Sequence, residues 1–311
     1  MEQSLLTVLP VVGIALLGLA CVKTGYLAQG AADAIARFAY AVILPLMIFR
    51  TMTQEGWPTR WDNGVEAIAA YFIAAALALV AGILLARLVF RSSAAEQRAI
   101  GIGGSHGNVA LMGLPAVVMI LGANLGQPIL LIVGLHGLVM APVVIAVAAL
   151  FAGRTNDLPK LLGTALRNQI RNPLLIALAA GLLANRLGLR LPEAADAIIR
   201  GLAAAAVPVA LFGAGAVLAR YRFGGALGKP AAIAAVKLVL HPAVAWLLAA
   251  KLFSLPGSWI WVVTMLAAMP TTMGADLPGD KPATGEAGTA VLLGAVLSVA
   301  SLAVLVYIIR M

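Results

Sequence analysis

The apolar residues of this 311-residue chain gather into ten long runs, and these runs limit its fold more than any other feature. Only 11% of the residues are charged, whereas a water-soluble domain carries about 25%. A bilayer core roughly 30 Å thick needs about 20 apolar residues for each helical crossing. No run shows the alternation that is typical of a transmembrane β-strand. We therefore expect an all-α integral membrane protein with about ten transmembrane helices, over residues 4–22, 35–53, 65–90, 98–122, 127–152, 172–188, 195–219, 230–252, 258–279 and 286–309.

A basic segment at residues 153–171 divides the chain into two parts of five spans each, residues 1–152 and 172–311. We interpret this segment as a hinge. The odd-numbered connections carry thirteen Lys and Arg residues, and the even-numbered connections and the two ends carry seven. Because positive charge favours the cytoplasmic side, the hinge should be cytoplasmic and both termini should face outward.

Prolines recur at similar positions in the two parts. Pro45 and Pro208 each precede a phenylalanine by four residues and lie 163 positions apart, and Pro115 and Pro270 lie 155 positions apart. A repeat with an odd number of crossings enters the membrane from the opposite side, as in many secondary transporters. This spacing favours two inverted repeats, although proline is also common in unrelated membrane helices.

The fourth span contains the residues that most disfavour a continuous helix. Gly107, Asn108, Gly113 and Pro115 follow each other within nine positions, and glycine and proline both weaken helices. Backbone groups freed by a break cannot face lipid, so the break must be buried in protein or line a polar cavity. The alternative is that the glycines, Gly103 and Gly107 for example, only allow close helix packing.

The ninth span has a matching weak point at Pro270, Thr271, Thr272 and Gly274. Two broken helices at corresponding positions of inverted repeats predict a transport site between them. The half-helix that follows each break presents the positive end of its dipole, which favours an anion such as a carboxylate. Asn108 could donate and accept hydrogen bonds at the same place.

Ionisable residues inside the spans are further candidates, because they are costly in a bilayer and usually face a cavity. Lys237 either pairs with the substrate or a nearby acid, or caps backbone carbonyls. Asp276 is either a proton carrier that partners Lys237 or a solvated acid near the end of its span. His106 is a candidate for proton relay, whereas we interpret His136 and His241 as packed core histidines.

Other chemistries lack their residues. The sequence has no phosphate-binding Gly-Lys-Ser/Thr loop and no His-Glu-x-x-His motif, and Cys21 is its one cysteine. We therefore expect no nucleotide-driven pump, no metal site and no cofactor. Basic residues are not interleaved with aromatic ones, which excludes nucleic-acid binding. Asp280 follows a Pro-Gly pair like an intramembrane aspartyl protease, but position 277 is a leucine.

Short motifs in order along the chain make it resemble the auxin efflux carrier (AEC) family of transporters. They are Leu44-Pro45 with Phe49, Gly107-Asn108 with Gly113 and Pro115, Pro208 with Leu211-Phe212-Gly213, Lys237 with His241-Pro242, and Met269-Pro270-Thr271. The resemblance covers nearly the whole chain.

The resemblance implies two inverted five-helix repeats in which the fourth and ninth helices are broken and cross at their breaks. It also implies elevator-type alternating access, with the first, second, sixth and seventh helices as a scaffold that supports a homodimer. Relatives move small organic anions such as auxin, malonate or malate, and the absence of a long central loop fits a bacterial inner-membrane member. Gly274 departs from the family, which usually has an asparagine at this position.

Together these observations predict a secondary transporter of a small mono- or dicarboxylate, coupled to protons or sodium. A sodium-coupled symporter of the bile-acid type is an alternative with the same architecture. An intramembrane protease and a non-transporting membrane subunit are alternatives of another class.

Overall fold

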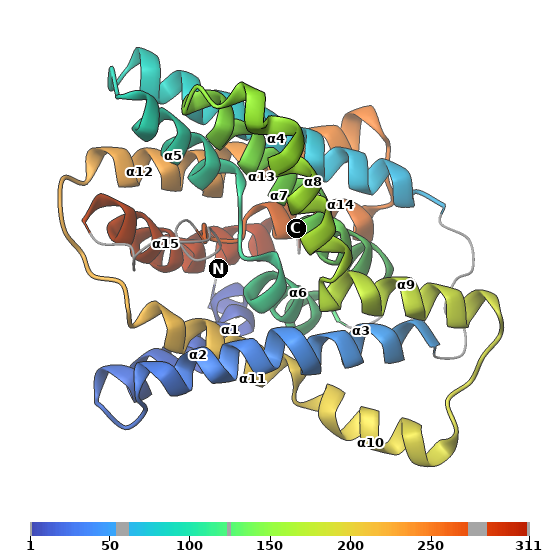
Figure 1. Cartoon of the computed structure of the whole chain (residues 1–311). Helices are drawn as coiled ribbons and strands as arrows, with labels where there is room; N and C mark the ends of the chain where they lie inside the picture. The colour runs from blue at the N-terminus through green and yellow to red at the C-terminus, as the bar shows by residue number, and fades with distance from the viewer. Residues whose placement is uncertain (1, 54–61, 123–125, 273–284, 310–311) are drawn as a thin grey trace.

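The computed structural model describes residues 2–53, 62–122, 126–272 and 285–309, which form an all-helical protein (Figure 1). Three π-helical turns, Ala39–Ile43, Val109–Gly113 and Val236–Leu240, lead directly into α-helices, and a fourth, Leu248–Leu252, follows one. The α-helices are α1 (Glu2–Lys23), α2 (Gln29–Phe38), α3 (Leu44–Thr53), α4 (Gly64–Leu88), α5 (Ala94–Ser105), α6 (Leu114–Leu121), α7 (Gly126–Phe151), α8 (Leu158–Ile170), α9 (Pro173–Arg186), α10 (Glu193–Ala204), α11 (Ala206–Leu218), α12 (Gly228–Ala235), α13 (His241–Leu247), α14 (Gly257–Ala267) and α15 (Glu286–Ile309).

Seven helical stretches are long and apolar enough to cross a membrane, and each overlaps one of the ten expected spans. The other three expected spans coincide with shorter apolar helices, Val109–Leu121, Pro173–Arg186 and Gly257–Ala267. Two of these shorter helices begin or end at the breaks predicted in the fourth and ninth spans. The structure thus supports a multi-pass membrane protein, while helix length alone accounts for seven crossings rather than ten.

Prolines explain three of the π-helical turns. Pro45, Pro115 and Pro242 each occupy the second position of the α-helix that follows such a turn. Proline has no N–H to donate and its ring crowds the carbonyl four residues earlier, and a wider turn is one way to relieve both problems inside a helix.

The helices form two groups that mix the two parts of the sequence. In Figure 1, α2, α3, α10 and α11 lie below, and α4, α5, α12 and α13 lie above. The lower group is built on contacts of α1 with α11, of α3 with α9 and α10, and of α2 with α11. The upper group is built on contacts of α4 with α5 and α13, and of α12 with α5. Helices α6, α7 and α14 contact members of both groups or each other.

The seam between α1 and α11 is a direct contact of two backbones. A methyl group at Gly215 would lie 1.8 Å from the carbonyl oxygen of Ala15, and one at Gly18 would lie 2.1 Å from that of Phe212. Small residues allow such close approach of membrane helices, which gain stability from packing rather than from water exclusion. The seam therefore depends on glycine at both positions.

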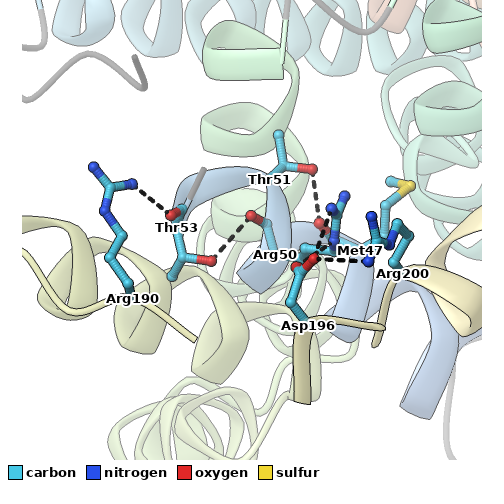
Figure 2. Close-up of polar contacts among 7 residues, drawn as sticks. All are labelled: Met47, Arg50, Thr51, Thr53, Arg190, Asp196 and Arg200. Atoms are coloured by element: carbon cyan, nitrogen blue, oxygen red, sulfur yellow. Dashed lines mark hydrogen bonds and ion pairs between the residues drawn. The ribbon is translucent and has the colours of Figure 1, made fainter. Parts of the chain in front are cut away.

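An ion pair joins α3 to α10 at the edge of the lower group (Figure 2). Arg50 Nε lies 2.8 Å from Asp196 Oδ1, and Arg200 lies 3.7 Å from the other carboxylate oxygen. Arg190 donates a hydrogen bond to the carbonyl oxygen of Thr53, which ends α3. Charge at this edge is paired and partly solvated, since the Arg50 and Asp196 side chains are 20% and 29% exposed.

The basic segment at residues 153–171, which we expected to be a hinge, is largely helical. It contains a short 3₁₀ turn at Thr155–Asp157 and then α8, which packs against α7. Ala165 is the one residue of α8 that is buried. The connection between the two parts of the sequence is therefore a surface helix.

Candidate functional site

The first break lies between α5 and the π-helical turn Val109–Gly113. The chain leaves the helix at His106, whose backbone is extended, and enters the next helical turn after Asn108. The predicted break at Gly107 and Asn108 is present, but it is shorter than expected, because Pro115 lies within the helix that follows. Glycine and the capping asparagine end and restart the helix here, and Pro115 acts on the turn before it.

The second break follows α14 and crosses the first. Gly107 and Thr271 form an antiparallel bridge, and the N–H of Asn108 donates a hydrogen bond to the carbonyl oxygen of Pro270, at 2.9 Å. Each break thus provides partners for backbone groups that the other frees, as buried polar groups in a membrane protein require. The contact brings together two segments more than 150 positions apart in the sequence.

Asn108 caps the half-helix that it precedes. Its side-chain Oδ1 accepts a hydrogen bond from the N–H of Leu111 at 3.2 Å, and its carbonyl oxygen accepts one from Gly113. An N-cap side chain satisfies one of the N–H groups that a helix start leaves open. This half-helix consequently has fewer unpaired N–H groups at its N-terminus than an uncapped helix, and Asn108 lies at that N-terminus.

Lys237 lies directly behind this crossing. Its side chain is 1% exposed, and it is the one Lys, Arg, Asp or Glu among the residues with described burial that is buried. The ammonium group donates to the carbonyl oxygen of Ala267, the last residue of α14, and lies 2.9 Å from His241 Nδ1. A methyl group at Gly107 would come within 2.8 Å of Lys237 Cε. Of the two roles considered for Lys237, the carbonyl contact is present in the structure.

Two of the predicted site residues, Gly274 and Asp276, lie outside the described residues, as does Asp280. Three others, Gly113, Pro115 and Lys237, do not line the cavity described below. Gly113 packs against α14, where a methyl group would lie 3.0 Å from side-chain atoms of Leu266 and Met269.

A cavity of about 440 Å³ adjoins the crossing. Six predicted residues line it: His106, Gly107, Asn108, Pro270, Thr271 and Thr272. Sequence reasoning missed other polar residues of its wall: Tyr40, His136, Gln169, Asn172 and Tyr221. Its size is within the usual range for a small-molecule pocket. The crossing therefore contributes one wall of a partly open cavity in which polar residues stand among apolar ones.

Asn172 organises the opposite wall. Its Nδ2 donates hydrogen bonds to the hydroxyl of Tyr40 and to Gln169 Oε1, both at 3.0 Å, and its Oδ1 accepts from the N–H of Leu174. The cavity thus lies between the crossing and the junction of α8, α9 and the turn Ala39–Ile43. The Asn172-Pro173 pair is a typical helix start, and this signal could have pointed to Asn172 from the sequence.

The glycines of α5 serve two different purposes. A methyl group at Gly101 would lie 3.0 Å from the carbonyl oxygen of Leu79 in α4, and one at Gly104 would lie 2.6 Å from the side chain of Val236. Helix packing therefore accounts for these two. Gly107 differs, because its neighbours are the Lys237 side chain and the carbonyl oxygen of Met269 at the second break.

The start of α5 is fixed electrostatically to α12. Ser93 and Glu96 form a reciprocal capping box, and Lys229 Nζ lies 2.5 Å from Glu96 Oε1. The hydrogen bond from Lys229, with those from Ser93, lowers the pKa of Glu96 to about 2.

Among the described residues, no three His, Cys, Asp or Glu side chains cluster as a metal site would require.

Comparison with known proteins agrees with this architecture. The family model described as "Membrane transport protein" matches residues 4–308. A Rhizobium meliloti (strain 1021) protein named "Putative malonate transporter" is 28% identical over 285 residues, which are 88% of this chain and 85% of the relative. Because the family match extends over nearly the whole chain, the resemblance found in the sequence is confirmed: this chain belongs to the membrane transport protein family, that of the auxin efflux carriers.

Proposed function

We propose that this protein is a secondary transporter of a small mono- or dicarboxylate, with its substrate site in the cavity at the crossed breaks. The observation that carries the proposal is the backbone contact between Asn108 and Pro270 beside a cavity with polar residues in its wall. Broken helices that meet inside a membrane protein typically form transport sites. Malonate is the first substrate to test, because the R. meliloti relative bears that name.

Uncharged groups make the direct contacts with the anion. Asn108 contacts the carboxylate directly at the start of its half-helix, whose dipole favours negative charge. The hydroxyl groups of Thr271 and Thr272 add hydrogen bonds from the second break. Pro115 and Pro270 maintain the two breaks. Lys237, behind Gly107, contributes its positive charge from a site that excludes water, where charge acts over longer distances than in solvent.

Transport follows an elevator-type cycle in two inverted five-helix repeats, with ten helices in all. The helix group of α1–α3 and α9–α11 is the scaffold and supports a homodimer, while the group that holds the crossing moves. The protein lies in the inner membrane of a bacterium with both termini outside. His106, Lys237 and Asp276 take part in ion coupling, and Gly274 replaces the second asparagine of the site.

The test is uptake of radiolabelled malonate into liposomes that contain the purified protein. Asn108→Ala should reduce uptake about tenfold or more, because it removes both the substrate contact and the helix cap. Asn185→Ala is the matched control: this asparagine donates to the carbonyl oxygen of Met52, away from the cavity, and its loss should leave uptake unchanged.

Uptake by Asn108→Ala at the rate of the unaltered protein, with both variants folded, would remove the site assignment. Replacing sodium by potassium distinguishes the coupling ions. Uptake that stops in potassium favours the sodium symporter, and uptake that continues excludes it.

A further inference from the structure

We propose that Tyr71, His136 and His241 form a buried proton path between the cavity and Lys237, which makes the proton the coupling ion. The proposal rests on the proposed transport function and extends it. Sequence reasoning had taken His136 and His241 for packing residues. The structure buries both histidines, as expected, and places them in a row of titratable groups through the core.

The row begins at the crossing. Lys237 Nζ lies 2.9 Å from His241 Nδ1, one helical turn further along the chain. The His241 ring lies beside Tyr71 of α4, with 5.7 Å between the ring centroids. All three side chains are at most 1% exposed. Lys237 and His241 are therefore in polar contact away from solvent, and His241 touches Tyr71 through its ring without a hydrogen bond to the Tyr71 hydroxyl.

The row continues to the cavity. The Tyr71 hydroxyl lies 3.4 Å from His136 Nδ1, on α7. His136 is 7% exposed and lines the cavity. The centroid of its ring lies 5.0 Å from the centroid of the His106 ring. His136 Nε2 is buried and has no hydrogen-bond partner among the described residues. The path thus ends on a cavity-lining residue with a ring nitrogen that can still accept or release a proton.

These groups can pass on a proton and return to their starting protonation states. A neutral imidazole carries one donor and one acceptor nitrogen, and a phenol hydroxyl both donates and accepts. A proton that leaves the Lys237 ammonium binds His241 Nδ1. His241 Nε2 has no hydrogen-bond partner among the described residues, so its ring must first turn toward the Tyr71 hydroxyl. The Nε2 proton then passes to the Tyr71 oxygen as the Tyr71 proton moves to His136 Nδ1. His136 then releases its Nε2 proton into the cavity. Reorientation of the two rings and the hydroxyl restores the row, so that Lys237 has lost one proton and the cavity has gained one.

The charges around Lys237 explain why this lysine would release a proton. Two groups outside the row face it: the Ala267 carbonyl oxygen of α14, which contacts Lys237, and the His106 ring at the end of α5, which lies beside His136. The other neighbours of each group are members of the row itself, namely Tyr71 of α4 and the histidines His136 and His241. No carboxylate with described burial is buried, and the described ones in ion pairs bind Arg or Lys: Asp33, Glu96, Asp157, Asp196 and Glu286. A bound anion compensates Lys237. When the anion leaves, an uncompensated buried charge is costly, and the release of a proton removes that cost.

The test uses liposomes that trap a pH-sensitive dye, with radiolabelled malonate as substrate. In the unaltered protein, malonate uptake should carry protons inward, and an inward acid gradient should accelerate it about fivefold or more. Tyr71→Phe keeps the ring and removes the hydroxyl, so it should bind malonate normally and lose the acceleration. Tyr307→Phe is the control: Tyr307 lies on α15, is 37% exposed, and belongs neither to the cavity wall nor to the row. Acceleration that is equal in all three proteins would overturn the path.

A second readout does not depend on transport. In ¹⁵N-histidine NMR spectra of the purified full-length protein, the pH titration of His136 should change in Tyr71→Phe and in Lys237→Met, and remain unchanged in Tyr307→Phe. A His136 titration that ignores both substitutions would overturn the path. If the unaltered protein does not move malonate at all, the proposed substrate fails, and these spectra still decide whether the row is coupled.

Discussion

The α1–α11 seam and the crossing of the two breaks are both places where separate parts of the chain approach at backbone distance. At the seam, glycines bring two continuous helices together over apolar surroundings, and carbonyl oxygens fill the space that side chains would take. At the crossing, Gly107 contacts a buried lysine and the carbonyl oxygen of Met269, and a cavity with polar residues in its wall adjoins it. A glycine by itself therefore indicates only close packing. The polar neighbours of Gly107 distinguish the candidate site from the packing seam.

The largest expected effect is at the seam. Gly215→Ala places a methyl group 1.8 Å from a backbone oxygen of Ala15, which cannot move without separating the helices. Overpacking of this kind costs about 3 kcal/mol or more. We expect most of the protein to be lost in fluorescence-detected size exclusion. Gly201→Ala, where a methyl group meets nothing within 4 Å, should fold normally; equal yields for the two variants would show that the seam is looser than described.

Gly107→Ala should affect transport more than folding. The added methyl group meets the end of the Lys237 side chain, which can shift, and the Met269 carbonyl oxygen at 3.0 Å, which has less freedom. We expect malonate uptake to fall about tenfold and folded yield to stay near that of the control Gly163→Ala. If instead yield collapses as at Gly215 while the remaining protein transports normally, the crossing is only a second packing seam.

The substitution Lys237→Met should change transport and stability in different ways. Methionine fills a similar volume and removes a charge that no described carboxylate compensates. Replacing buried charge by apolar volume is often neutral or stabilising, so the apparent unfolding temperature should stay the same or rise while uptake falls about tenfold. Lys251→Met, at an exposed lysine, should change neither. A large drop in unfolding temperature for Lys237→Met would make its contact with Ala267 chiefly structural.

Arg50→Gln tests paired charge at the scaffold edge and should have the smallest effect. The Arg50–Asp196 pair is partly solvated, and such pairs contribute little to stability. We expect the apparent unfolding temperature to fall by about 2 °C or less, with uptake unchanged. Loss of transport in this variant would mean that the scaffold edge takes part in the cycle.

The positions of the breaks could be predicted because their causes are local. Glycine and proline weaken a helix wherever they stand, so Gly107 and Pro270 indicated both breaks, and the lysine inside an apolar span was conspicuous for its charge. The contact between Asn108 and Pro270 required in addition the assumption that the two breaks face each other.

The remaining parts of the site depend on tertiary contacts. His136, Tyr40 and Gln169 line the cavity because helices from distant parts of the chain meet there, and nothing in their neighbouring residues indicates it. Likewise, the seam depends on which helix faces Gly18 and Gly215, and the basic segment became α8 because it packs on α7. Periodicity and charge indicate which residues form helices, but not which helices become neighbours.

The most direct test of the account asks whether malonate occupies the cavity. Because Cys21 is the one cysteine, Cys21→Ser provides a background in which Thr272→Cys, on the cavity wall, and Gly163→Cys, on the exposed face of α8, can be labelled separately with a maleimide. Malonate at concentrations that saturate uptake should slow labelling at Thr272→Cys about tenfold and leave Gly163→Cys unaffected. Equal labelling rates at Thr272→Cys with and without malonate would contradict the placement of the anion at the crossed breaks.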